Sequence, residues 1–193
     1  PKSEQERQIQ TGETAQSIGF LKRYTVFNVE QCEGIDVETD QAAAKTEADL
    51  IPSVKTIIDN MGVPFHFGGN KAFYMPSVDA ITMPPMSAYY EPIDFYRTAL
   101  HELSHSTGHK SRLDRKLDNA RGSHAYGFEE LIAEISASFC CAALSIKPTV
   151  RHSDYIGAWL EIMKEDNRAI FKAASRASKA ADFILAFAEG EGA

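Results

Sequence analysis

Residues 101–109, HELSHSTGH, carry the side chains of this chain that are best suited to chemistry. His101 and His105 are four residues apart, so on an α-helix they project about 40° apart and can reach one metal ion together. Neutral imidazole is a good ligand for zinc, and a catalytic zinc ion takes three protein ligands and leaves one position for water. The spacing therefore predicts a zinc (Zn²⁺) site that needs one more ligand.

Glu102 lies between the two histidines in sequence and points to the adjoining helix face. A zinc ion lowers the pKa of its bound water to about 7, and a carboxylate beside that water can take its proton and later pass it to a leaving amine. The motif thus predicts Glu102 as the general base of peptide hydrolysis. The competing interpretation is a surface or hydrogen-bonded histidine pair. Apolar Ala99, Leu100 and Leu103 disfavour it, because they indicate a half-buried helix in which such a pair needs a partner.

The third ligand has two candidate sources in the sequence. One is the arrangement HExxHxxGxxH, which would need a histidine where Ser111 stands. His109 comes two residues too early for that pattern, so it is the weaker candidate. The other source is a carboxylate on a second helix.

The acidic segment EELIAE, residues 129–134, follows a loop long enough to reverse the chain. Glu130 and Glu134 share one helical face, so Glu130 can bind the ion while Glu134 accepts the free N–H of one of the two histidines. A solvated helix face is the alternative for both acids. Glu129 is expected to be exposed.

A donor for the developing oxyanion is also needed, and Tyr126 shortly precedes the acidic segment. Its hydroxyl is our candidate for this role, and the imidazole of His124 is the competitor.

Two kinds of element must position these residues. The segment from Phe20 to Ile35 favours a strand, and residues 63–69 and 71–85 favour two further strand regions, the second folded into a hairpin at Pro76. Helical periodicity covers residues 46–62, where Gly62 would end the helix. It recurs from Pro92 to Gly108, from Phe128 to just before Pro148, and beyond Ser153. The pattern predicts an α+β fold, with a small antiparallel sheet packed on helices and the HExxH helix at the active site.

Size and composition narrow the class of protein. A chain of 193 residues fits one domain, alone or with a small appendage, and the net charge of −7 disfavours a surface coated by nucleic acid. Residues 1–17 are polar and indicate a loose arm. The three cysteines, Cys32, Cys140 and Cys141, are expected to be small buried residues of a reduced, cytoplasmic protein. No apolar run is long enough to span a membrane, so no membrane partner is expected.

Two groups of basic residues and one sheet edge offer weaker signals. A solvated face is the favoured interpretation of the first group, and the second could steer an acidic peptide or DNA toward the site. The hairpin at residues 72–83 could pair with an extended peptide. The first group is Lys164, Arg168, Lys172 and Arg176; the second is Lys110, Arg112, Arg115, Lys116 and Arg121.

The segments FYRTALHELSHSTGHKSRLDR and YGFEELIAEISASF together resemble the zincin-like metallopeptidase domain of ArdC-type antirestriction proteins and TraC-type plasmid primases. The resemblance covers most of the chain. In gluzincin-like peptidases an E-x-x-A-D/E run supplies the third ligand through its first acid. Here ELIAE matches with Glu130 and Glu134, although many such enzymes have Asp at the second acid.

The segment YTVFNVEQCEG resembles the end of the single-stranded-DNA-binding domain of the same family. The resemblance implies that residues 1–35 are an arm and a remnant of that upstream domain, and that residues 36–193 form the metallopeptidase domain. A chain that begins at Pro1 is consistent with a fragment or a processed protein. Single-stranded DNA would then bind through the missing part.

The function predicted is a zinc-dependent metallopeptidase-type hydrolase of a mobile-element antirestriction protein, acting on a peptide or protein substrate. The alternative is a non-proteolytic, zinc-containing antirestriction protein associated with single-stranded DNA. A third hypothesis, a metal-free helical interaction module, requires that no zinc is bound.

Overall fold

The computed structural model describes Thr25 and residues 31–34, 47–117, 120, 122–147 and 156–188, with the backbone alone for residues 47–50. The chain divides into two units, residues 1–42 and 43–193. The arm predicted over residues 1–17 and most of the strand predicted over residues 20–35 lie outside the described residues, and residues 31–34, at the end of that segment, do not form a strand. The second unit holds the candidate site.

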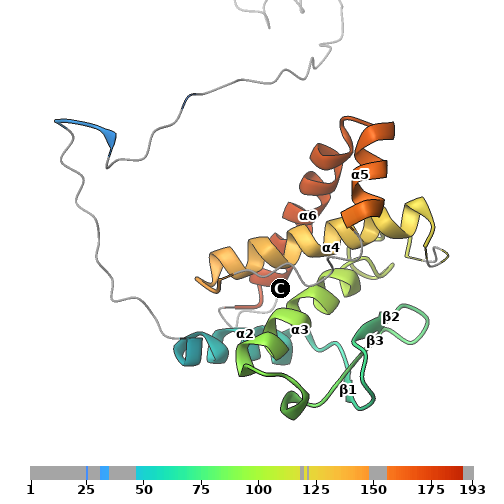
Figure 1. Ribbon diagram of the computed structural model, residues 1–193. Helices are drawn as coiled ribbons and strands as arrows, with labels where there is room; N and C mark the ends of the chain where they lie inside the picture. The colour runs from blue at the N-terminus through green and yellow to red at the C-terminus, as the bar shows by residue number, and fades with distance from the viewer. Residues whose placement is uncertain are drawn as a thin grey trace, which may run out of the picture. The chain divides into compact units, whose positions relative to one another are not determined.

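The second unit begins with helix α2, continues with a small sheet and ends with further helices (Figure 1). This order confirms the predicted α+β class. No helix among the described residues combines the length and the apolarity that crossing a membrane requires. In chain order the elements are α2 (Glu47–Met61), β1 (Phe65–Phe67), β2 (Phe73–Met75), β3 (Ala80–Met83), the 3₁₀ helix η2 (Met86–Ala88), α3 (Pro92–Ser106), α4 (His124–Ala143), α5 (Ile156–Glu165) and α6 (Ala169–Leu185).

The three-stranded sheet is mixed rather than antiparallel as predicted, and β3 is its central strand. β3 pairs antiparallel with β2, as the turn signal at Pro76 predicts, but it pairs parallel with β1, with Phe65 opposite Ile81. Turn residues indicate a hairpin between consecutive strands and do not say which strand takes the centre. β3 takes it because this strand is the most buried of the three, with Ile81 and Met83 fully buried.

Helix α2 follows the predicted apolar stripe. Val54 and Ile57 are fully buried in the core that α2 shares with α3. The helix ends at Met61, and Gly62 follows with a φ of 64°, a left-handed conformation that favours glycine. The predicted helix and its glycine stop are thus confirmed.

Helices α3 and α4 form the centre of the unit (Figure 1). The sheet and α2 pack against α3, whereas α5 and α6 pack against α4. Buried apolar side chains form two clusters, a larger one around α3 and a smaller one between α4, α5 and α6. In the smaller cluster Trp159 is 8% exposed and donates its indole N–H to the carbonyl of Gly127 at 3.1 Å. Cys140 and Cys141 are buried, as predicted, whereas Cys32 is only partly buried.

Small polar side chains line part of the contact between α3 and α4. Ser104 and Ser136 are fully buried, and their hydroxyl oxygens are 3.0 Å apart. Ser104 also donates to the carbonyl of Leu100, one turn earlier in α3. Side chains of this size let the two helices lie close together. Longer side chains one turn away can therefore reach across from α4 to α3.

Candidate metal centre

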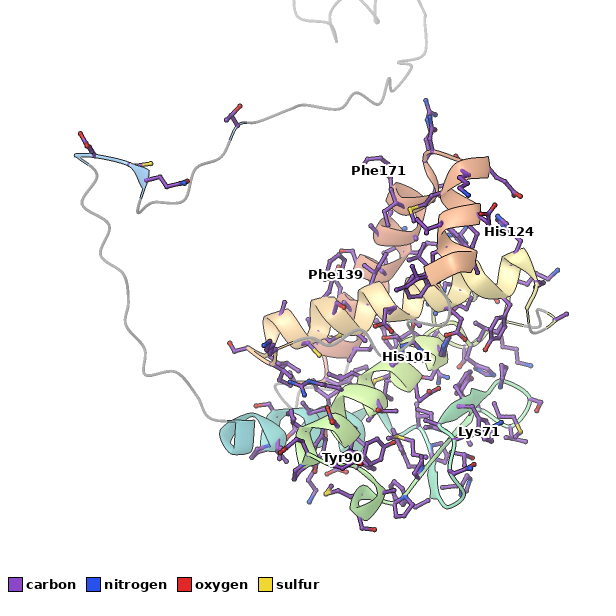
Figure 2. The ribbon with its side chains drawn as sticks, viewed as in Figure 1. Lys71, Tyr90, His101, His124, Phe139 and Phe171 are labelled. Atoms are coloured by element: carbon purple, nitrogen blue, oxygen red, sulfur yellow. The ribbon has the colours of Figure 1, made fainter. Side chains whose placement is uncertain are left out.

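The HExxH motif lies on the face of α3 that points to α4. His101 is 3% exposed, and Figure 2 shows it between the two central helices. The rings of His101 and His105 have centroids 4.9 Å apart and planes inclined at 80°. One helical turn thus brings the two imidazoles side by side, as their spacing predicts.

Glu130 of α4 faces both histidine rings. Its Oε2 is 3.5 Å from Nε2 of His101, and its Oε1 is 3.6 Å from Nε2 of His105. One ligand atom from each of the three residues lies within 4.8 Å of the others. Ligand atoms at about 2.1 Å from a tetrahedral zinc ion are themselves about 3.4 Å apart. The three side chains therefore fit a metal ion with little rearrangement.

Two more carboxylates of α4 lie behind the histidines. Oε2 of Glu134 is 3.2 Å from Nδ1 of His101, and Oε1 of Glu129 is 3.4 Å from Nδ1 of His105. Each ring thus turns one nitrogen toward Glu130 and the other toward a separate acid. The prediction that Glu129 is exposed was wrong, since this residue is only 8% exposed.

The loop between α3 and α4 supplies the partner of Glu129. Arg115 donates two hydrogen bonds to that carboxylate, at 2.7 and 3.1 Å. Arg112, on the same loop, pairs with Asp79 and donates to the carbonyl of Ser106 at 2.7 Å. These two arginines, which the sequence grouped with a steering patch, are therefore structural. Lys110 and Lys116 of the same group are exposed, and Arg121 lies outside the described residues.

The charges of the centre shift the pKa values of its groups. Burial alone would lower the pKa of His105, but hydrogen bonds to Glu129 and Glu130, with the negative charge of Glu102 nearby, raise it to about 10. The pKa of His101 is raised for the same kind of reason, through Glu130 and Glu134. Burial alone would raise the pKa of the Glu130 carboxyl, but its hydrogen bonds to both histidines hold it well below the usual range. Without a metal, the centre is therefore a set of buried ion pairs.

The two predicted catalytic residues lie at this centre. Glu102 is 3% exposed on α3, next to both histidines, and its charge acts on each of them. Tyr126, in the first turn of α4, is half-buried, and its hydroxyl hydrogen-bonds with Glu130. The N-cap residue Ser123 accepts a hydrogen bond from the backbone N–H of Tyr126 and so fixes this turn. Their catalytic roles stay predictions.

The two weaker histidine candidates lie elsewhere. Nδ1 of His109 is 2.7 Å from the Ser111 hydroxyl and 3.6 Å from Asp79. The exposed ring of His124 lies 3.3 Å from Glu165 of α5, away from His101 (Figure 2). Neither ring belongs to the group of metal-ligand atoms among the described residues.

The basic residues of the C-terminal helices do not form one basic stripe. Lys164 pairs with Glu161 on α5, and Lys172 of α6 pairs with Asp166. The guanidinium of Arg176 lies over the ring of Phe128, 5.4 Å from its centroid. Helix α5 ends at Glu165 and α6 begins at Ala169, so Lys164 lies on α5, Arg168 lies between the helices, and Lys172 and Arg176 lie on α6. Lys164 and Lys172 pair with acids while their side chains stay 70% and 60% exposed, as the interpretation of a solvated face expects.

Comparison with known proteins agrees with this geometry. The sequence profile of the zincin-like metallopeptidases matches residues 52–176, which contain α3, α4 and every residue of the centre. The chain belongs to the zincin-like metallopeptidase family. The family resemblance inferred from the two sequence segments is therefore confirmed.

Two curated relatives of this zincin-like domain are longer proteins. Over 169 residues it is 37% identical to the uncharacterized protein y4eC of Sinorhizobium fredii, and this stretch covers 86% of the chain and 54% of the relative. It is also 40% identical over 169 residues to the DNA primase TraC of Escherichia coli, covering 84% of the chain and 15% of the primase. The chain thus spans about half of the first relative and a small part of the second.

Crystal structures of the antirestriction protein ArdC from plasmid R388 share the fold of this zincin-like domain. The Mn(II)-bound structure has a TM-score of 0.72 at 35% identity, over 90% of this chain and 68% of that one. The metal-free structure has a TM-score of 0.75 at 37% identity, over 96% and 67% of the two chains. The relative has therefore been solved with and without a metal ion.

Proposed function

We propose that this zincin-like domain is a zinc-dependent metallopeptidase-type hydrolase of an antirestriction protein, with His101, His105 and Glu130 as ligands and Glu102 as general base. The observation that carries the proposal is the convergence of two imidazole Nε2 atoms on one carboxylate, at 3.5 and 3.6 Å. Two imidazoles and a carboxylate are the ligand set of many catalytic zinc sites.

The chain's own groups would divide the work of peptide hydrolysis. A bound metal ion supplies Lewis acidity, which polarises a carbonyl and makes water acidic. Glu102 would take the proton of the attacking water and return it to the leaving amine. Tyr126, whose hydroxyl already reaches Glu130, would donate to the developing oxyanion. Glu134 would accept the Nδ1–H of His101, so that Nε2 of that ring faces the ion.

Substitution of the general base tests the catalytic part of the proposal. Glu102→Gln keeps the size of the side chain and removes its basicity, so we expect peptide cleavage to fall by about 10²–10⁴-fold, the usual share of general-base catalysis. Metal content should stay at the wild-type level. The assay is cleavage of a peptide library, with metal content measured by mass spectrometry. Equal cleavage by wild type and variant would reject Glu102 as the base.

The identity of the metal needs its own test. Imidazole and carboxylate ligands suit zinc, and manganese is also plausible because the ArdC relative has a Mn(II)-bound structure. Competition between Zn²⁺ and Mn²⁺ for the purified metal-free chain, followed by metal analysis, would decide. We expect Zn²⁺ to be retained, since zinc lies above manganese in the usual affinity order of divalent ions.

The second candidate is an antirestriction protein that contains zinc, associates with single-stranded DNA and cleaves nothing. Relatives named a DNA primase and an antirestriction protein favour it. In either case we propose that the protein is cytoplasmic, that residues 1–35 are the remnant of an upstream DNA-binding domain and that residues 36–193 are the metallopeptidase domain. Salt-dependent binding of single-stranded DNA by the present chain would favour this candidate, and negligible binding would leave DNA binding to the proposed upstream domain.

A further inference from the structure

His105 has a partner that lies outside the metal-ligand motifs. Nδ1 of its ring faces Oε1 of Glu129 at 3.4 Å, in the way that Nδ1 of His101 faces Glu134 at 3.2 Å. Of these two carboxylates, only Glu134 belongs to the E-x-x-A-E run. Glu129 comes directly before that run, so in the sequence Glu129 and Glu134 flank Glu130.

Arg115 fixes the carboxylate of Glu129. Nη2 of Arg115 donates to Oε1 at 2.7 Å and Nε donates to Oε2 at 3.1 Å, which is the two-pronged geometry that only arginine provides. The side chains of Arg115 and Glu129 are 7% and 10% exposed. A paired carboxylate held this way has little freedom to turn from His105.

The same guanidinium is tied to the end of α3. It donates from Nη1 to the hydroxyl of Thr107 at 2.7 Å and from Nη2 to the carbonyl of Ser104 at 2.8 Å. Gly108 makes room for it, because a Cβ there would lie 3.1 Å from Nη2 of Arg115 and 2.8 Å from Leu117. Arg115 thus links the turn that carries His105 to the helix that carries Glu129.

We propose that Glu129, held by Arg115, is a positioning residue for His105. Its carboxylate accepts the Nδ1–H of the ring, so that Nε2 is the nitrogen that gives up its proton and faces the ion when the metal binds. A carboxylate behind a ligating imidazole fixes the tautomer and raises the basicity of the ligand. The inference rests on the proposed metal site and is independent of peptide hydrolysis.

The same loop provides a matched control. Arg112 is also largely buried and anchors the loop, but its partners are Asp79, Tyr74 and the carbonyl of Ser106. A change at Arg112 disturbs the loop without touching Glu129. The two arginines therefore separate anchoring of the loop from positioning of His105.

The test measures Zn²⁺ affinity of the full chain by competition with a chromophoric chelator. We expect Glu129→Gln and Arg115→Lys to weaken binding by about 10–100-fold, as for other partners of ligating histidines. Arg112→Lys should leave affinity near the wild-type value. Circular dichroism of the metal-free proteins checks that each variant folds.

A second readout follows the ring itself. Nitrogen NMR of the metal-loaded wild type should show His105 protonated at Nδ1. Glu129→Gln should weaken the signal of that Nδ1–H. Wild-type protein that binds no Zn²⁺ would overturn the proposed metal site. Wild type that binds Zn²⁺ while Glu129→Gln binds it equally well, or while Arg112→Lys loses as much as Arg115→Lys, would overturn the positioning role alone. In the metal-loaded wild type, a His105 ring protonated at Nε2 would do the same even if the variants fail to fold.

Discussion

Charged side chains gather in two regions of the second unit, and the two regions differ in how far these side chains are buried. Between α3 and α4, Glu129, Glu130 and Glu134 are at most 8% exposed, and each contacts a histidine. On α5 and α6, Lys164 and Lys172 pair with acids at 2.7 and 2.6 Å, but their side chains are 70% and 60% exposed. Exposed pairs contribute little to stability, whereas buried charges are costly unless each has a partner.

The comparison shows why charge periodicity alone does not identify a functional site. A repeat of basic residues every four positions looked as regular in the sequence as the repeat of acids on α4. Only the second repeat is buried against imidazoles. The contrast predicts that changes at the α3–α4 centre act on metal binding, and that changes at α5 and α6 act on packing or on nothing measurable.

The largest effect is expected from loss of a ligand. His105→Ala removes one of the two imidazoles that face Glu130, so Zn²⁺ affinity should fall by more than about 100-fold, beyond the loss expected for the outer carboxylates. His124→Ala is the control, because its ring is exposed and pairs with Glu165. Isothermal titration with Zn²⁺ gives both affinities, and similar losses in the two variants would contradict the proposed centre.

A larger side chain in the buried contact of α6 should lower the free energy of unfolding without changing metal binding. Ala177 is fully buried in the cluster that contains Trp159. Ala177→Leu forces extra volume into this contact, so we expect the free energy of unfolding to drop by about 1–3 kcal/mol. Urea denaturation measures the drop, and Zn²⁺ affinity should not change. Ala158→Leu, at an exposed position on α5, is the control for side-chain size.

Acid should weaken metal binding at the centre. Burial opposes protonation of His105, but its carboxylate partners raise the pKa of the metal-free ring to about 10, so the ion must displace a proton at neutral pH. Below the pKa of the ring, protons compete with Zn²⁺ for His105, and they compete more strongly as the pH falls. Zn²⁺ affinity should therefore drop by about tenfold for each unit of pH per displaced proton. Titrations at pH 8, 7 and 6 check the slope, and an affinity independent of pH would contradict these ion pairs.

The smallest effect is expected from the exposed pair on α6. Lys172→Gln removes the partner of Asp166 at a site open to solvent. Neither Zn²⁺ affinity nor the thermal melting temperature should change beyond the error of measurement. A clear loss of metal affinity would show that the two regions are coupled.

Local patterns in the sequence were sufficient to predict much of the fold and the residues that meet at the metal centre. The helical stripes predicted α2, α3 and α4, and the spacing in HELSHSTGH and EELIAE selected His101, His105, Glu130 and Glu134. These signals lie within single elements, where periodicity determines which residues share a face. The roles of these residues remain to be tested by the experiments above.

Contacts between elements could not be predicted in the same way. The parallel pairing of β1 with β3 depends on which strand is buried in the centre, and a turn signal does not encode that. Glu129 was missed because neighbours on a helix point about 100° apart, so an acid next to Glu130 was expected to face solvent. A buried arginine on the connecting loop draws it inward, and the sequence offered Arg115 only as one of several basic residues.

The histidines and the acids of the centre come from separate helices, and the chain between them is a loop held by two arginines. An ion bound by both helices would act as a reversible cross-link that closes the segment between His105 and Glu130. Such a link removes conformations from the unfolded chain, and binding free energy becomes folding free energy. Because α5 and α6 pack on α4, the C-terminal half of the unit would share that stabilisation although it contributes no ligand.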